Sequence, residues 1–194
     1  MKPAKIALCG KARAGKDTVA VHLAGTYGFH TYAFGDALKD VAKRLYRDKF
    51  DADRKPRALL QTLGEHLCEY DPDIFIDATF TKIADDVRWL GANNVSRIAI
   101  TDLRKQHELD RLRAEGFTVI RVTAPDELRL ARAKQAGDDF SASDFEHPTE
   151  TAVDGFDVDY EVTNDGSLDD LWTQVDEIMR TLGVEPRRER RRFL

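Results

Sequence analysis

The stretch "CGKARAGKDTVA", residues 9–20, decides how the rest of the chain is interpreted. Gly10, Gly15 and Lys16 match the G-x-x-x-x-G-K pattern of a loop whose backbone N–H groups hold phosphate. The apolar run "KIALC" at 5–9 predicts a buried strand before the loop. Residues 15–27 predict a helix after it, and the N-terminus of a helix attracts anions. This context favours a phosphate-binding loop, with Lys16 on the β and γ phosphates, over a chance match on a glycine turn.

The position after Lys16 departs from the common pattern. Ser or Thr normally follows the lysine and ligates magnesium, but here Asp17 stands in that place and Thr18 follows. A carboxylate is a good oxygen ligand for Mg²⁺, either directly or through water. An acid is also favoured in the first turn of a helix by the helix dipole, so both interpretations of Asp17 stay open. Thr18 is expected to bond an oxygen of the α phosphate.

Strand-like and helix-like patterns alternate along the whole chain. The expected strands lie at 5–9, 29–34, 96–102, 117–125 and 159–164, and the expected helices at 15–27, 35–46, 55–70, 71–91, 103–116, 126–137 and 167–183. This alternation predicts an α/β fold with a mostly parallel sheet. The stretch 138–159 contains eight acidic residues and no Lys or Arg. We interpret it as too polar for the core and expect a loop or lid.

Length and composition limit the class of protein. A chain of 194 residues with 42% hydrophobic content and no apolar run near 20 residues predicts one domain over 1–186, in the cytoplasm and not in a membrane. Its cysteines, Cys9 and Cys68, do not suggest a disulfide framework. The tail 187–194 carries five Arg and one Glu, a net +4, so the rest carries −9 of the total −5. The tail is interpreted as a solvated extension or, alternatively, as an arm toward nucleic acid; the acidic body argues against a broad nucleic-acid surface.

Two later motifs carry polar residues after predicted strands. In "AITDLRKQHE", 99–108, Asp102 ends an interior strand and faces the crevice where α/β proteins bind ligands. It is a candidate to hold magnesium or accept a proton, and Arg104 to bind a phosphate; the alternative is an N-cap and a surface arginine. Glu108 is compatible with an exposed helix face. In "TNDGSLDDL", 163–171, the residues by themselves indicate a turn and a helix cap.

The ordered set of motifs resembles the deoxynucleoside monophosphate kinases of phages and prophages. These enzymes have a phosphate loop (P-loop) and are similar to nucleoside monophosphate kinases, dephospho-coenzyme A kinase and phosphomevalonate kinase. The matching segments are "GKARAGKDTVA" (10–20), "AFGDALKD" (33–40), "LLQTLGE" (59–65), "ITDLRKQHE" (100–108), "HPTE" (147–150) and "VTNDGSLDDL" (162–171). They occur in the family's order, and G-K-D-T is itself typical of the group.

The resemblance implies a P-loop NTPase three-layer α/β/α sandwich with acceptor-binding helices and a lid near 129–150. It implies phosphorylation of a (deoxy)nucleoside monophosphate to the diphosphate with ATP and Mg²⁺, and a homodimer. The residues implied for ATP are Gly10, Arg13, Ala14, Gly15, Lys16, Asp17, Thr18, Arg129 and Asn164; for the acceptor Asp36, Lys39, Gln61, Arg104, Glu108 and Glu150; for catalysis Lys16, Asp102, Arg104 and Arg132; and for the metal Asp17 and Asp102.

One departure from the family concerns positive charge. No Arg lies between Arg57 and Arg88, where the family often supplies one, so a phosphate-binding arginine from that region is absent or replaced. Arg13 is a candidate for the missing charge, or simply an exposed loop arginine. Two rival functions stay open: a P-loop kinase for another small phosphate ester, of the dephospho-coenzyme A or phosphomevalonate type, and a nucleotide-binding switch without transfer activity.

Overall fold

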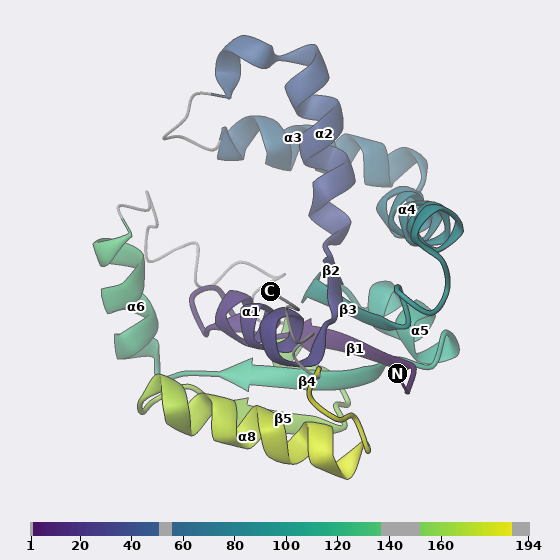
Figure 1. Cartoon of the computed structure of the whole chain (residues 1–194). Coiled ribbons are helices and arrows are strands. Elements are labelled where there is room, and N and C mark those ends of the chain that lie inside the picture. The colour runs from purple at the N-terminus through teal and green to yellow at the C-terminus, as the bar shows by residue number, and fades with distance from the viewer. Residues whose placement is uncertain (1, 51–55, 137–151, 188–194) are drawn as a thin grey trace, which may run out of the picture. The chain divides into compact units, whose positions relative to one another are not determined.

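The computed structural model describes residues 2–50, 56–136 and 152–187. The chain divides into two compact units, which Figure 1 shows and which we describe separately. The sheet unit comprises Met1–Thr31 and Asn93–Leu194, and the helical unit comprises Tyr32–Ala92. The assignment of 1–186 to one domain stays a prediction.

The sheet unit is built on a five-stranded sheet in the order β2-β3-β1-β4-β5. The strands are β1 (Ala4–Cys9), β2 (His30–Tyr32), β3 (Arg97–Leu103), β4 (Thr118–Thr123) and β5 (Tyr160–Thr163). The pairs β1–β3, β1–β4 and β4–β5 are parallel, with Ala7 opposite Ile100 and Val122 opposite Val162. This arrangement confirms the predicted α/β fold with a mostly parallel sheet.

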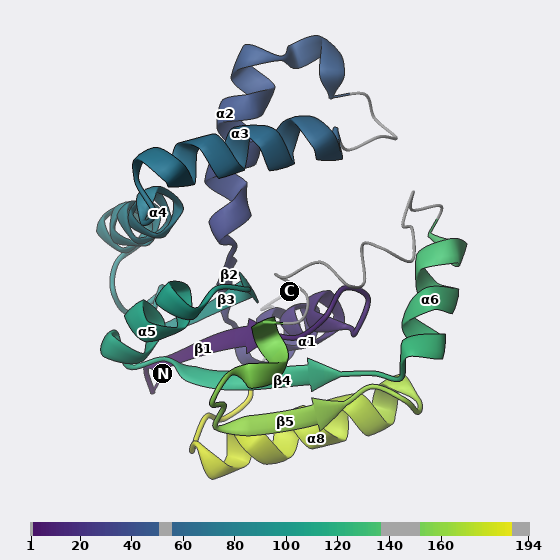
Figure 2. The same cartoon turned by 180° about the vertical axis from the view of Figure 1, so that it is seen from behind.

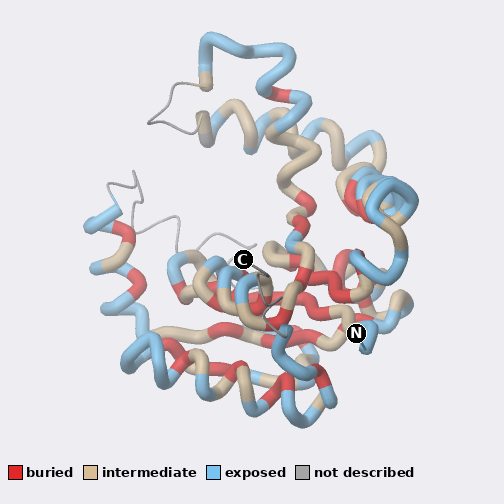
Figure 3. Tube along the Cα trace, in the orientation of Figure 1, coloured by how far each residue is buried: buried red, intermediate tan, exposed pale blue. Residues whose placement is uncertain are grey.

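Helices α1 (Lys16–Tyr27) and α8 (Leu168–Thr181) supply the main core on one face of this sheet. Their apolar side chains, such as Leu23 and Val175, cluster with Leu8, Ile120 and other strand residues. Figure 3 shows the buried segments running through the strands. Cys9, as expected, is a fully buried core residue. Its burial raises the pKa of the thiol to about 11, although Arg121 and Lys16 nearby lower it.

The opposite face of the sheet carries α5 (Gln106–Ala114) and the short 3₁₀ helix η3 (Ala152–Gly155), as Figure 2 shows. Successive side chains of a strand point to opposite faces, so Arg121 lies on the face opposite Ile120. Its guanidinium donates to the carbonyls of Asp154 (3.2 Å) and Phe156 (2.6 Å). Helix α6 (Asp126–Gln135) follows β4.

The segment 152–159 corrects one expectation. Residues 137–151 lie outside the described part of the chain, so the lid prediction is not tested there. Val153 and Phe156, however, are 1% and 5% exposed. The prediction that the whole stretch 138–159 is too polar for the core is therefore wrong at this end. The two apolar side chains lie three residues apart, and Arg121 satisfies neighbouring carbonyls, so the segment packs despite its acids.

A buried arginine ties the chain ends of the sheet unit together. Arg97, 2% exposed, donates to the carbonyls of Tyr27 (2.6 Å), Glu185 (2.7 Å) and Lys2 (3.3 Å). The end of α1, the start of the chain and the segment after α8 therefore share one guanidinium. Residues 188–194, which hold most of the arginine tail, lie outside the described part.

The helical unit contains α2 (Phe34–Leu45), η1 (Arg47–Lys49), α3 (Arg57–Tyr70) and α4 (Ile74–Leu90). Gly64 lets α3 approach α2 closely, because a Cβ there would lie 2.9 Å from the Leu38 side chain. Tyr32, before α2, donates from its hydroxyl to the Asp86 carboxylate on α4 at 2.9 Å. In the described residues, no helix is both long and apolar enough to cross a membrane.

Candidate active site

The glycine loop lies at the carboxyl end of the central strand β1, as the sequence predicted. Gly10 and Gly15 have φ of 138° and 111°, which side chains rarely adopt. A Cβ at Gly10 would lie 2.2 Å from the Val122 carbonyl oxygen, and one at Gly15 would lie 2.1 Å from the Asn164 amide nitrogen. Both glycines of the motif are therefore required by close backbone approach as well as by conformation.

Lys16 begins α1 and points its ammonium back into the loop. The side chain is 8% exposed, and Nζ donates to the carbonyls of Gly10 (2.6 Å) and Lys11 (2.9 Å). The ammonium thus lies beside the positive end of α1. This combination of charge and helix N-terminus fits a polyphosphate group.

Asp17 and Thr18 lie in the first turn of α1. Asp17 is exposed and Thr18 is half-buried. The N-cap residue is Gly15, with no side-chain cap bond, so Asp17 is a first-turn acid and not the cap itself. In the described part of the chain, no group of three or more His, Cys, Asp or Glu side chains gathers into a metal site. A magnesium ion bound with phosphate needs only one or two protein carboxylates, which Asp17 and Asp102 can supply.

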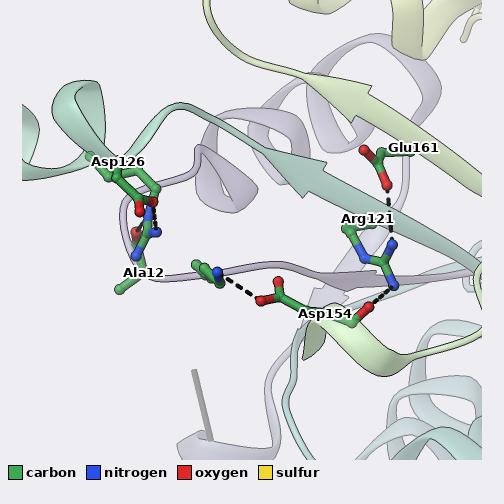
Figure 4. Close-up of polar contacts among 7 residues, drawn as sticks. Ala12, Arg121, Asp126, Asp154 and Glu161 are labelled. Carbon is green, nitrogen blue, oxygen red and sulfur yellow. Dashed lines mark hydrogen bonds and ion pairs between the residues drawn. The ribbon is translucent and has the colours of Figure 1, made fainter. Parts of the chain in front are cut away.

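Two predicted lid arginines contact the loop backbone. Arg129 is 2% exposed; its Nε donates to the Ala12 carbonyl at 2.9 Å and its Nη1 to Asp126 at 2.5 Å, an end of the site visible in Figure 4. Arg132 donates from Nη1 to the Arg13 carbonyl at 3.3 Å. Arg13 itself is exposed and has φ of 62°. The predicted roles of Arg129 and Arg132 on phosphate are not tested by these contacts.

Asn164, just after β5, completes this set of contacts. Its Nδ2 donates to the Ala14 carbonyl at 2.8 Å, and its Oδ1 accepts from Arg132 Nη2 at 3.2 Å. The residue is 6% exposed. The helix cap predicted in this turn exists one step later, where Ser167 Oγ accepts from the Asp170 N–H at 3.1 Å. Sequence reasoning missed the bracing role of Asn164, because its partners are about 150 and 32 positions away.

On the other side of the face that holds the loop, Lys11 pairs with Asp154 of η3 at 2.7 Å. Figure 4 shows Asp154 between this lysine and Arg121, which also pairs with Glu161 at 3.1 Å. A small cavity of about 100 Å³ lies here, lined by Gly10, Lys11, Arg121, Arg129 and neighbouring residues. Its cations and carboxylates pair with one another. Sequence analysis gave no signal for these pairs.

Asp102 and Arg104 lie at the same edge of the sheet as the loop. Leu103 of β3 is opposite Cys9, the residue before Gly10, so the turn after β3 starts level with the glycine loop. Both Asp102 and Arg104 are half-buried. The prediction that an acid ends the interior strand at the ligand-binding edge is confirmed for position; its chemical role stays a prediction.

Glu108 differs from the expectation of an exposed helix face, which is wrong. It is 8% exposed, and its Oε2 accepts from the N–H groups of Arg104 (2.8 Å) and Lys105 (2.9 Å). Burial raises the pKa of this carboxyl group, as does the charge of Asp102, while the two N–H bonds lower it. The substrate contact predicted for Glu108 is not tested.

The acceptor residues predicted in the helical unit are only partly brought together. Lys39 Nζ lies 2.8 Å from Asp36 Oδ1, whereas exposed Gln61 on α3 bonds Glu65 at 3.2 Å. A cavity of about 250 Å³ between α2 and α4 is lined by Tyr32, Ala33, Asp36, Ala37, Asp40, Val41, Arg44, Ala78, Thr79 and Lys82. Lys39 and Gln61 are not among these residues, and Glu150 lies outside the described part of the chain. The helical spacing of 36, 40 and 44 was the available signal for Asp40 and Arg44.

Comparison with known proteins settles the family. A family model described as deoxynucleotide monophosphate kinase matches residues 53–175, more than half of the chain. The chain belongs to the deoxynucleotide monophosphate kinase family. This confirms the resemblance found in the motifs. Because the matched range starts at 53, the phosphate loop rests on the structure described above.

A curated member of the deoxynucleotide monophosphate kinase family is similar over part of its length. The deoxynucleotide monophosphate kinase of Enterobacteria phage T4 is 32% identical over 83 residues, which are 43% of this chain and 29% of the phage protein. The match therefore spans less than a third of that protein.

Solved structures of other kinases share the fold of this family member. A sugar kinase from Janibacter sp. HTCC2649 matches with a TM-score of 0.55 and 15% identity, over 94% of this chain and 96% of that one. Shikimate kinase from Aquifex aeolicus gives 0.52 and 14%, over 92% and 98%. A gluconokinase from Sinorhizobium meliloti gives 0.52 and 17%, over 93% and 96%. At these identities the likeness shows the P-loop kinase fold alone.

Proposed function

We propose that this chain transfers the γ-phosphoryl group of ATP to a (deoxy)nucleoside monophosphate, giving ADP and the nucleoside diphosphate. The observation that carries the proposal is the Lys16 ammonium, held by the Gly10 and Lys11 carbonyls at the start of α1, in a chain of the deoxynucleotide monophosphate kinase family. Phosphoryl transfer needs positioning and charge stabilisation more than covalent chemistry from the protein.

The loop residues are assigned to ATP. Lys16 and the backbone N–H groups of 10–15 bind the β and γ phosphates, and the positive end of α1 adds to the attraction. Thr18 bonds the α phosphate, and Arg129, Arg132 and Asn164 are the candidates on the lid and adenine side. Mg²⁺, when bound, neutralises charge on the phosphates; Asp17 and Asp102 are the oxygen donors that would hold it.

The acceptor is assigned to residues of both units. In the helical unit the proposal gives Asp36, Lys39 and Gln61 to the nucleotide, and in the sheet unit it gives Arg104 to the acceptor phosphate. A bidentate guanidinium suits a phosphate that must be held in one orientation. Arg44 and Lys82 line the cavity of the helical unit and are candidates to replace the arginine that the sequence lacks between 57 and 88.

The proposal is tested by ADP release from ATP and Mg²⁺ with a panel of acceptors. The panel holds the four deoxynucleoside monophosphates, their ribo forms, dephospho-coenzyme A and phosphomevalonate. We expect one or more nucleoside monophosphates to be phosphorylated, and Lys16→Met to abolish transfer while the protein stays folded. Lys49→Met is the matched control, because that lysine side chain is 62% exposed and lies on η1.

Two results separate the rivals. Phosphorylation of a non-nucleotide ester alone would leave a P-loop kinase but overturn the nucleotide acceptor. Tight ATP binding without acceptor-dependent ADP release would favour a nucleotide switch. Full activity of Lys16→Met would contradict the assignment of the loop itself.

A further inference from the structure

We propose that Glu108 is a positioning residue, which fixes the turn that carries Arg104, and not a residue that touches the acceptor. The inference rests on the proposed phosphoryl transfer, because it concerns how Arg104 is presented to the acceptor phosphate. It replaces the substrate contact expected for Glu108 from the motif.

The hydrogen bonds of Glu108 are directed into the backbone. One carboxylate oxygen, Oε2, accepts from two consecutive N–H groups, those of Arg104 at 2.8 Å and Lys105 at 2.9 Å. Two bonds to adjacent peptide units fix the orientation of both planes. The backbone between β3 and α5 is therefore held from inside the protein at the residue that bears the proposed phosphate ligand.

The held turn lies at the place where chemistry is proposed. Leu103, the residue before Arg104, is opposite Cys9, and Gly10 follows Cys9. The sheet fixes the turn on one side through Leu103, and Glu108 fixes it on the other. Displacing a substrate-positioning group by about 1 Å costs on the order of 100-fold in rate, so a residue that holds such a turn has a large effect without contacting substrate.

The bonding goes beyond an ordinary helix cap. Glu108 is the third residue of α5, and an acid there commonly bonds the N–H of the N-cap residue, here Lys105. Glu108 also takes the N–H of Arg104, one residue earlier, and is 8% exposed. Burying a carboxylate is costly unless it is well hydrogen-bonded. A surface acid could cap the helix without that cost, so the buried position favours a role in the turn.

The kinetic test compares Glu108→Ala, Glu108→Gln, Arg104→Gln and the double variant Glu108→Ala/Arg104→Gln. Asp110→Ala is the control, because Asp110 is an exposed acid on the same helix that bonds only the Gln106 side chain among the contacts described. Initial rates are measured well below each variant's unfolding temperature, with the KM of ATP and of the acceptor determined separately.

We expect kcat/KM for the acceptor to fall by roughly 10- to 100-fold in Glu108→Ala, with the KM of ATP unchanged. Glu108→Gln should recover most of the loss, because an amide oxygen accepts the same two bonds and Gln serves in capping boxes. The double variant should be no slower than Arg104→Gln alone, since Glu108 acts through Arg104.

Three results would overturn the proposal. Multiplicative losses in the double variant would mean that Glu108 acts independently of Arg104. Unchanged kinetics with a lowered unfolding temperature would mean a purely structural role. The third is independent of activity: if the amides of Arg104 and Lys105 remain as protected from hydrogen exchange in Glu108→Ala as in the unmodified chain, Glu108 does not hold the turn. An unmodified chain that phosphorylates no acceptor contradicts the proposed function instead, and the exchange measurement still decides the role of Glu108.

Discussion

Replacing Asn164 tests whether the phosphate loop is braced from β5. In Asn164→Ala the Ala14 carbonyl loses its donor at 2.8 Å, and Arg132 loses an acceptor at 3.2 Å. The site is buried, with Asn164 6% exposed, so water replaces these bonds poorly. A buried polar group left without its partner costs about 1–3 kcal/mol, which gives an expected loss of about 2–3 kcal/mol in the free energy of unfolding.

Asn164→Asp is the sharper perturbation, because its shape is conserved. The donor nitrogen becomes a carboxylate oxygen facing the Ala14 carbonyl, so a hydrogen bond turns into repulsion. Arg132 offsets part of the buried charge. We expect a loss of about 3 kcal/mol at neutral pH, near the lower end of the cost of an uncompensated buried charge. At 2–4 °C per kcal/mol for a chain of this size, the unfolding temperature falls by roughly 6–12 °C.

The effect of Asn164→Asp should depend on pH in a defined direction. Burial and the facing carbonyl favour the protonated form of the introduced carboxyl, so its pKa in the folded chain is raised. Such a group destabilises the protein as pH rises above its unfolded value, and the protonated form can donate to Ala14. The difference from Asn164→Ala should therefore shrink as pH is lowered from neutral toward about 4.

Urea unfolding at several pH values measures these losses, and the KM of ATP reports on the loop. Loosening the loop by about 1.4 kcal/mol would raise the KM of ATP about tenfold. Asn93→Asp is the control, because Asn93 is exposed. The reasoning is refuted if Asn164→Asp unfolds at the same urea concentration as Asn93→Asp and keeps an unchanged KM for ATP.

Three further perturbations follow from the sheet unit. Gly10→Ala places a Cβ 2.2 Å from a backbone carbonyl at φ of 138°, so unfolding should become easier by about 3 kcal/mol or more, measured by urea; equal stability would contradict the packing. Arg97→Met leaves three backbone carbonyls without their donor, and calorimetry should show a loss of about 2–4 kcal/mol, unless water reaches them. Burial alone would raise the pKa of Asp176, but hydrogen bonds from His22 and Tyr27 outweigh it and lower the value. The resulting stability is present above the unfolded pKa and lost as pH falls, so Asp176→Asn should flatten the acid side of the stability curve; with 39% of the side chain exposed, about 1 kcal/mol is at stake at neutral pH.

Local patterns were sufficient to predict the elements of the fold. The apolar run before Gly10 and the helical spacing after Gly15 placed β1, the loop and α1 within one residue of their observed bounds. The Ser167 cap also follows from neighbouring residues, because Asp170 lies only three positions away. Such features depend on short-range contacts, which the sequence displays directly.

Side-chain partners far apart in sequence could not be predicted in this way. The burial of Glu108 depends on the packing of α5, and the same acid on an exposed face would have produced the same sequence pattern. Val153 and Phe156 lie in a stretch whose composition is dominated by acids, and their burial depends on Arg121 of another strand. Composition averages over a segment, whereas packing is decided by one or two side chains within it.

The residues expected to contact ATP from outside the loop make one pattern when their partners are compared. Arg129, Arg132 and Asn164 donate to the carbonyls of Ala12, Arg13 and Ala14, three consecutive peptide groups of the loop. The N–H and C=O of a trans peptide unit point in opposite directions. Holding three successive carbonyls toward α6 and β5 therefore turns the N–H of each of these peptide units to the other side. A concave row of N–H groups is an anion-binding arrangement, so these side chains can favour phosphate by orienting the loop even without touching the nucleotide.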